Sequence, residues 1–301
     1  MQNDPITQFR QALADAGVIL ALHSPIIADG ALHRAPLVTD RPGQKTAWYR
    51  LHLDSPIAGA GGDWRQGLSV RWSMKSQSAL TNKEREMLQH RIERERAERQ
   101  ADLEAQHKEA AKRALWIWNH ASSAKADHEY LRRKQIHPGI ARQRDDLLLL
   151  PITGFDGDLR GIQTIAEDGS KRFTRGMAKM DAFIRVDAMP AQDRQMIVCE
   201  GWATASSVAE LSPGACVIAA LDAGNLMHVG TEARKRFPRI DLVIAADADP
   251  VGMEKAKAAA IAANGKWIWP KFPKDAPAGL SDFNDWIVWR RSQRRDGSNA
   301  G

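Results

Sequence analysis

The sequence predicts an α/β fold, α+β overall, whose C-terminal part is a Rossmann-like parallel sheet with helices on both faces. Between about 196 and 269, short apolar runs alternate with helix-forming segments, which is the pattern of such a sheet. Two of the runs end in acidic residues, at Glu200 and at Asp247. A chain of 301 residues, 43% of them hydrophobic, can bury this core and that of a second domain.

Residues 1–78 are expected to form a small α+β domain. A helix over 7–16 is stopped by Gly17, and strand-like runs separated by glycine-containing turns follow it. Tryptophans and arginines alternate along these runs: Trp48, Arg50, Trp64, Arg65, Arg71 and Trp72. Two interpretations stay open, namely nucleic-acid bases stacked on indoles with arginines on phosphates, or tryptophans buried in a small core.

Residues 79–115 are expected to be a long, solvated linker helix. The stretch from Thr81 to Ala114 contains no glycine or proline and consists mostly of strong helix formers. Thr81 and Glu84 have the spacing of an N-terminal capping box, and opposite charges recur four residues apart. No sustained heptad repeat is present, so a coiled coil is not indicated.

Residues 116–190 are expected to be a basic segment that contains a β-meander, with three short strands joined at the Asp-Gly pairs 156–157 and 168–169. Residues 191–290 then form the parallel sheet. Its strands are expected at 196–200, 215–221, 242–247 and 266–269, and its helices at 203–211, 231–237 and 252–264. The polar residues 291–301 are expected to be a disordered tail.

Three carboxylates follow two of the predicted strands. Glu200 closes one apolar run, and Asp247 and Asp249 close another. Ligands bind at the carboxyl ends of parallel strands, and isolated buried charges are strongly disfavoured. Asp249 alone could be a helix N-cap before Pro250, but a cap does not account for Asp247 or Glu200. The pattern therefore predicts a Mg²⁺ or Mn²⁺ site with oxygen ligands.

Two further acids, Asp282 and Asp285, lie after the last strand, and either could complete the metal site or cap a helix. Other chemistries lack their motifs, since the sequence has no GxxxxGK[ST], HExxH or GxSxG. The two cysteines, Cys199 and Cys216, lie in apolar runs, which excludes a disulfide scaffold and a cysteine zinc ribbon.

The net charge of +6 is compatible with a polyanionic partner but does not establish one. No apolar run is long enough to span a membrane, and the first residues lack the pattern of a signal peptide. We therefore expect a cytoplasmic protein without a membrane partner.

The strand ending in Glu200-Gly201 and the strand ending in Asp247-Ala248-Asp249 resemble the Toprim domain of DnaG-type primases, topoisomerases and some nucleases. The stretch LLLLPITGFDGDLRGIQTIAEDGSKRF resembles the segment that precedes Toprim in DnaG-type primases, with Lys171 and Phe173 as its Lys-aromatic pair. EGWATASSVA and LSDFNDW, with the weaker matches ADGALHR and GGDWRQG, are similar to the Toprim primases of plasmids, phages and integrative elements.

This resemblance implies a DNA primase that makes short RNA primers on single-stranded DNA from ribonucleoside triphosphates, with a replicative helicase as partner. It implies catalysis and metal binding by Glu200, Asp247 and Asp249, with Asp282 as a further metal ligand. The residues expected to bind template or nucleotide are Lys171, Arg172, Arg160, Arg175, Arg132 and Arg65. Two features depart from the pattern: no zinc ribbon is present, and Thr204 stands where DnaG-type primases usually carry an aspartate.

Two other functions remain open from the sequence. A Toprim nuclease would use the same acids to cut DNA, and a non-catalytic adaptor would only bind single-stranded DNA in a replisome. A topoisomerase of the type IA class would need a nucleophilic tyrosine, and neither Tyr49 nor Tyr130 lies in a recognisable context for one.

Overall fold

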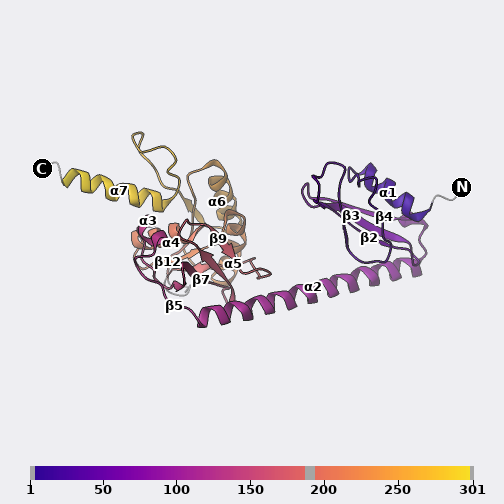
Figure 1. Ribbon diagram of the computed structural model, residues 1–301, viewed down its shortest axis with the longest axis horizontal. Helices are drawn as coiled ribbons and strands as arrows, with labels where there is room; N and C mark the ends of the chain where they lie inside the picture. The colour runs from indigo at the N-terminus through magenta and orange to yellow at the C-terminus, as the bar shows by residue number, and fades with distance from the viewer. Residues whose placement is uncertain (1–3, 187–193, 299–301) are drawn as a thin grey trace. The chain divides into compact units, whose positions relative to one another are not determined.

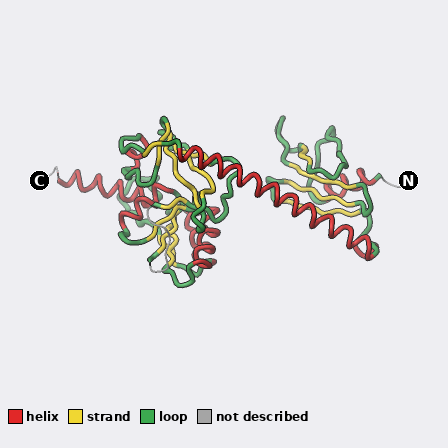
Figure 2. The backbone as a smooth tube through the Cα atoms, turned by 90° about the horizontal axis from the view of Figure 1, so that it is seen from below, coloured by secondary structure: helices red, strands yellow, loops and turns green. Residues whose placement is uncertain are grey.

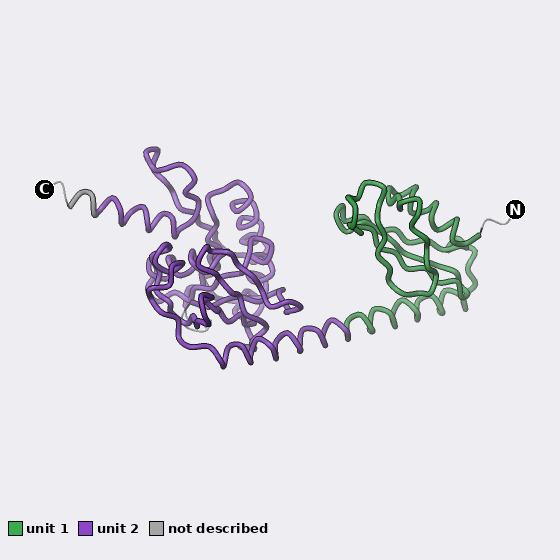
Figure 3. The backbone as a smooth tube through the Cα atoms, in the orientation of Figure 1, with its two compact units in different colours: residues 1–101 green, residues 102–301 purple. Residues whose placement is uncertain are grey.

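The computed structural model describes residues 4–186 and 194–298, and it consists of two compact units, residues 1–101 and 102–301 (Figure 3). Helix α2 (Asn82–Asn119) begins in the first unit and ends in the second (Figure 1). The domain boundary expected at 190/191 lies outside the described residues. In the part of the chain that is described, no helix is long and apolar enough to cross a membrane.

The first unit is an antiparallel sheet covered on one face by helix α1 (Pro5–Asp15). Its strands pair in chain order: β1 (His33–Ala35), β2 (Ala47–His52), β3 (Ala58–Asp63) and β4 (Leu68–Ser73). Because side chains alternate along a strand, Tyr49 and Leu51 join the core with Phe9 of α1. The helix begins two residues before the expected start, because Asp4 caps it and accepts from the Thr7 N–H at 3.3 Å.

Helix α2 begins with the predicted capping box. A short 3₁₀ turn, η1 (Gln77–Ala79), precedes it. The Thr81 N–H donates to Glu84 Oε2 at 2.8 Å, and the Glu84 N–H donates to Thr81 Oγ1 at 3.2 Å. The helix extends four residues beyond the expected end at 115, because its last turns bury Ala114 against Leu149 and Ile162.

The second unit contains an antiparallel sheet and a mainly parallel sheet. The antiparallel sheet pairs in order β5 (Ser122–Ser123), β6 (Arg142–Arg144), β7 (Leu147–Thr153), β8 (Leu159–Ile165) and β9 (Lys171–Phe173). Helix α3 (Glu129–Lys134) lies between β5 and β6 in the sequence. The predicted meander corresponds to β7–β9, and Gly157 and Gly169 take left-handed φ values of 85° and 90° in its two turns.

The mainly parallel sheet, whose strands are among those drawn in yellow in Figure 2, has the order β10-β12-β11-β13-β14. Its strands are β10 (Ile184–Arg185), β11 (Met196–Cys199), β12 (Cys216–Ala219), β13 (Leu242–Ala245) and β14 (Lys266–Ile268). The last four match the predicted strands and are parallel. The sheet has one antiparallel edge that the sequence did not predict, where β10 pairs with β12. This two-residue strand is too short to show a hydrophobic period in the sequence.

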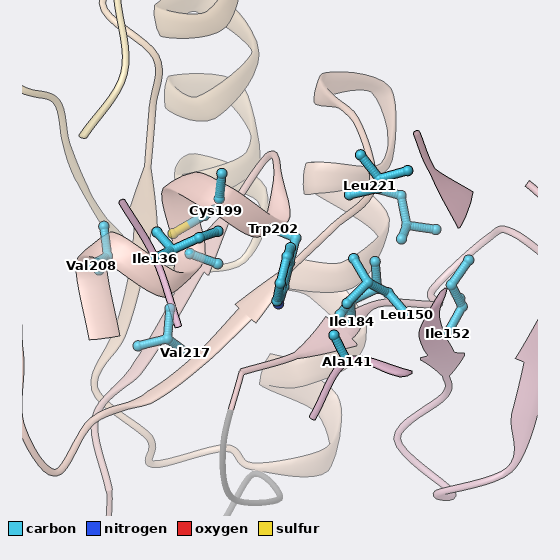
Figure 4. Packing of buried hydrophobic residues seen from close by; sticks show 14 of the residues in the cluster. Ile136, Ala141, Leu150, Ile152, Ile184, Cys199, Trp202, Val208, Val217 and Leu221 are labelled. Atoms are coloured by element: carbon cyan, nitrogen blue, oxygen red, sulfur yellow. The ribbon is translucent and has the colours of Figure 1, made fainter. Parts of the chain in front are cut away.

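Helices cover both faces of this sheet, as predicted: α4 (Trp202–Leu211), α5 (Leu226–Arg236) and α6 (Pro250–Ala262), with a 3₁₀ turn η2 (Ala223–Asn225) before α5. Cys199 of β11 packs in one cluster with Trp202 of α4 and Leu150 of β7 (Figure 4). Val198, the preceding residue of β11, packs with α5 and α6 residues on the opposite face. The antiparallel sheet therefore shares a core with the α4 face.

Helix α7 (Phe283–Ser298) ends the described chain. The expected disordered tail from residue 291 is therefore wrong as far as Ser298, and residues 299–301 lie outside the described part. The Arg291 guanidinium donates to the Gln135 carbonyl at 2.9 Å and also contacts the Glu210 carboxylate. These contacts anchor the helix in the region where the sequence shows only polar residues.

Candidate metal and nucleotide site

Acidic residues from three strands meet at one edge of the parallel sheet. Cys199 and Ala245 are in register at the ends of β11 and β13, so Glu200 and Asp247 follow adjacent strand ends. Asp222 follows β12, the neighbour of β11 on its other side. This is the carboxyl edge of the sheet, where open α/β folds bind their ligands.

These acids repel one another, and their partial burial disfavours their ionised forms. Desolvation, followed by the charges of Glu200, Asp282 and Asp249, raises the pKa of Asp247 to about 7. Asp247 Oδ1 is buried and has no hydrogen-bond partner among the described residues. Desolvation, Asp222 and Asp249 also raise the pKa of Glu200. The edge therefore carries more negative charge than its protein surroundings neutralise.

Asp249 has two functions at this edge. As the N-cap of α6, its Oδ1 accepts from the N–H groups of Val251 at 3.0 Å and Gly252 at 2.9 Å, so the predicted capping role is confirmed. Its charge nevertheless raises the pKa of both Glu200 and Asp247. Capping and a contribution to the acidic site are compatible in the same residue.

Asp282 and Asp285 cap helix α7 together. Asp282 Oδ1 accepts from the Asp285 N–H at 2.8 Å, and Asp285 Oδ2 accepts from the Ser281 N–H at 3.1 Å. The Ser281 carbonyl accepts from the Ala248 N–H at 2.6 Å, which ties this cap to the loop that carries Asp247. Asp282 is thus brought to the acidic edge from a distant part of the sequence.

Asp222 is a member of this edge that the sequence analysis did not single out. Its Oδ1 accepts from the Asn225 N–H at 3.1 Å, and its carboxylate contacts the Lys179 ammonium. Leu221, directly before it, has a left-handed φ of 80°, which is uncommon for a leucine. The available signal was the run 215–221, which also ends in an acid. Thr204, by contrast, is buried in α4 and brings no charge.

The acidic edge fits Mg²⁺ or Mn²⁺ that is held partly by water and substrate phosphates, and it does not fit a metal ion coordinated by protein side chains alone. In the residues that the structure describes, no three His, Cys, Asp or Glu side chains form a group that could hold an ion alone. Mg²⁺ commonly keeps several waters and binds through one or two carboxylates and substrate phosphates. The unpartnered Asp247 Oδ1 and the nearby Glu200 carboxylate are suited to such an ion.

Lys171 is the predicted basic residue that the structure brings to the acids. Its Nζ lies 3.7 Å from the position that a Cβ on Gly201 would occupy, directly after Glu200. Desolvation and the Lys134 ammonium lower the pKa of Lys171, while Glu200 and two aspartates oppose that effect. Lys134, which sequence reasoning did not include in the site, also lies 3.4 Å from Asp285 Oδ1.

The other predicted basic residues are not joined to these acids by any hydrogen bond or ion pair within the described ranges. Three of them lie beside other acids: Arg160 beside Asp156, Arg132 beside Glu129, and Arg65, in the first unit, beside Asp40. Arg172 and Arg175 are exposed on and after β9. The nucleic-acid roles of all five stay predictions.

A comparison with known protein families matches the segment that carries these acidic residues. Residues 195–292 match the family model for the Toprim domain. This segment of the chain is therefore similar to a Toprim domain. It includes Glu200, Asp222, Asp247, Asp249 and Asp282, whereas Lys171 comes from the antiparallel sheet before it.

Two curated relatives from Escherichia coli, both named DNA primase TraC, are 33% and 30% identical to this chain over 299 and 303 residues. The alignments cover 91% and 92% of this chain but only 28% and 21% of the relatives, so the chain spans about a quarter of their length. The predicted resemblance to Toprim-containing primases is confirmed.

Solved structures similar to the chain include the primase fragment of the bacteriophage T7 primase-helicase protein, with a TM-score of 0.42 and 15% identity, covering 58% of this chain and 74% of that one. A DNA primase domain from Pseudomonas aeruginosa has a TM-score of 0.36 and 13% identity, covering 56% of this chain and 57% of that one.

Proposed function

We propose that this chain is the primer-synthesising part of a DNA primase, which joins ribonucleotides on a single-stranded DNA template. The observation that carries the proposal is the acidic edge of the Toprim domain, with Asp247 Oδ1 unpartnered and Lys171 facing the acids. The relatives named DNA primase TraC support the same reaction class. We place it in the cytoplasmic replication of a plasmid, phage or integrative element.

In this proposal Glu200 and Asp247, with Asp249 and Asp282 nearby, would hold Mg²⁺ or Mn²⁺. When bound, such an ion neutralises phosphate charge and activates the attacking 3′-hydroxyl. Lys171 would bind a phosphate of the incoming triphosphate or of the template, because its ammonium reaches the same edge from β9. The N-cap role of Asp249 would fix the loop that presents Asp247.

Strand passage through a covalent tyrosine link is not supported by the tyrosines of this chain. Tyr49 is 2% exposed, and its hydroxyl donates to the Pro25 carbonyl at 3.2 Å. Tyr130 is 3% exposed, and burial raises its pKa to about 12. A nucleophile must be accessible and readily deprotonated, and neither side chain is.

The test is primer synthesis on varied single-stranded DNA templates with labelled ribonucleotides and Mg²⁺ or Mn²⁺. We expect Asp247→Asn to lower the rate by about 100-fold or more, because the charge at the reacting edge is lost. Lys171→Ala should cost about 10- to 100-fold for the same reason. Lys112→Ala is the matched control, because it removes the same charge from an exposed position on α2, where Lys112 pairs with Glu109 and not with the acidic edge.

The proposal is wrong if the wild-type chain makes no product on any template, or if Asp247→Asn is as active as wild type. Cleavage of labelled DNA without nucleotides would instead indicate a Toprim nuclease. DNA binding that is indifferent to metal and to Glu200→Gln, without synthesis, would indicate a non-catalytic adaptor. A replicative helicase partner is part of the proposal, and stimulation of synthesis by a helicase added to the assay would support it.

A further inference from the structure

The first unit contains a groove of about 530 Å³ that belongs to none of the chemistry above. One wall is the face of the β1–β4 sheet opposite to α1, and the other is the first half of α2. The helix presents Leu88, Ile92, Glu95 and Arg99 at helical spacing to this groove. A groove of this size can hold a small-molecule ligand or a short stretch of a polymer.

The floor of the groove is made flat by the small residues of β3. Ala60 lies between Arg50 of β2 and Arg71 of β4 in the strand register, and Gly62 lies beside Trp48. A Cβ on Gly62 would lie 2.7 Å from Trp48 Nε1, so the indole lies directly over the strand backbone. The absence of large side chains on β3 therefore leaves space between two arginines and beside an aromatic ring.

The inner basic residues of the groove are already paired. Arg50 lies 2.6 Å from Glu95, and Glu95 also lies 2.8 Å from His52 Nε2. Arg91 lies 2.7 Å from Asp54. These half-buried pairs hold the sheet and the helix together and fix the two walls of the groove.

Two outer arginines of the groove are different. Arg71 and Arg96 are exposed, and neither has an acidic partner among the described residues. One projects from β4 and the other from α2, so unneutralised guanidinium groups face the groove from both walls. Arginine binds phosphate oxygens through its planar fork of donors, which makes an anionic polymer the fitting occupant.

An aromatic pair lies beside these charges. The rings of Trp48 and Trp64 are 5.5 Å apart, and Trp64 is 57% exposed although tryptophan is costly to leave in water. Trp48 lines the groove itself. An exposed indole packed on a partly buried one next to a basic groove is an arrangement with which proteins bind single-stranded nucleic acid without reading its sequence.

We propose that this groove, lined by Arg71, Arg96 and Trp48 and with Trp64 packed on Trp48 beside it, binds single-stranded DNA, with phosphates on the arginines and a base stacked on the tryptophan pair. The binding itself needs no metal and none of the Toprim acids. Its use, to hold the template strand during synthesis, rests on the function proposed above. Of the two interpretations that the sequence left open, burial holds for Trp72, which packs on Phe9, and base stacking is proposed for Trp48 and Trp64.

The test is fluorescence anisotropy of a labelled single-stranded DNA oligonucleotide with the full chain, in EDTA, over a range of salt concentrations. Arg71→Ser combined with Arg96→Ser should lower the salt slope by about 1.4, because each single-strand phosphate contact contributes about 0.7. Trp64→Ala should weaken binding by about tenfold, and Trp64→Phe should restore most of it, because phenylalanine still stacks.

Lys83→Ser combined with Arg94→Ser is the matched control. Both residues are exposed on α2 outside the groove lining, and the double substitution removes two positive charges, as the Arg71/Arg96 variant does. An equal loss in this control and in the Arg71/Arg96 variant, both with wild-type melting temperatures, would overturn the proposal. Tighter binding of RNA than of DNA of the same sequence, or competition by free ribonucleoside triphosphate, would also overturn it. Asp247→Asn should bind DNA normally, so failed synthesis and failed groove binding are separate results.

Discussion

Asp247 is the residue at which burial and charge oppose each other most directly. Its pKa rises from the ordinary 3.8 to about 7, first through desolvation and then through the neighbouring acids. The native chain therefore holds this proton more tightly than the unfolded chain does. Between pH of about 4 and 7 the contribution of Asp247 to the stability of the metal-free protein falls as pH rises, because deprotonation is easier in the unfolded state.

Asp247→Asn should consequently stabilise the metal-free protein at pH 8 although it slows primer synthesis. We expect a gain of about 1–2 kcal/mol in the free energy of unfolding, reduced from the full effect because water screens a partly exposed group. The measurement is thermal unfolding in EDTA at pH 5 and pH 8, with a larger gain at pH 8. Asp241→Asn is the control and should lower the stability at pH 8, because Lys266 and Gln195 lower the pKa of Asp241 and so stabilise its ionised form in the native state. A lower melting temperature for Asp247→Asn at pH 8 would contradict this explanation.

At the scale of the element, the capping hydrogen bond and the negative charge that Asp282 brings to α7 can be tested separately. Asp282 both caps the helix and raises the pKa of Asp247. Serine is about as good an N-cap as aspartate but carries no charge. Asp282→Ser should therefore be at least as stable as wild type, because it keeps the cap and removes a like charge beside Asp247, and should still lower the apparent Mg²⁺ affinity in synthesis assays. Asp282→Ala should be about 1 kcal/mol less stable than Asp282→Ser. Equal stability of the two variants, measured by urea unfolding, would show that the cap is not the structural contribution of this residue.

The elements around the site also show what the sequence can and cannot predict. Strands β11 and β13 were predicted to within two residues at their ends, because uninterrupted apolar runs end in acids there. Strand β10 was missed, since two residues show no period. Asp282 and Lys171 could be named from motifs, but their approach to Asp247 depends on tertiary contacts such as the Ala248–Ser281 hydrogen bond. Asp222 was missed although the apolar run 215–221 ends at it, because its place at the acidic edge depends on the pairing of β12 beside β11, a tertiary contact.

At the scale of the whole molecule, the two units have separate cores and separate candidate sites. The acidic edge lies in residues 102–301, and the proposed DNA groove lies in residues 1–101. Helix α2 joins them, and each of its halves is fixed to its own unit: Glu95 to Arg50 in the first, and Ala114 to Leu149 in the second. A ligand of one unit should therefore stabilise that unit without a necessary effect on the core of the other.

Hydrogen exchange followed by mass spectrometry can measure this separation in the full chain. Mg²⁺ bound as proposed would bind the native state only, so it should slow amide exchange in the peptides that follow β11 and β13 and leave residues 47–73 unchanged. A single-stranded oligonucleotide in EDTA should do the reverse, with protection in β2–β4 and in the first half of α2. Asp247→Asn should remove the first effect and keep the second, and Arg71→Ser with Arg96→Ser should do the opposite. Protection of both units by Mg²⁺ alone would contradict two separate sites, because the proposed carboxylate ligands of the ion all lie at the acidic edge of the second unit.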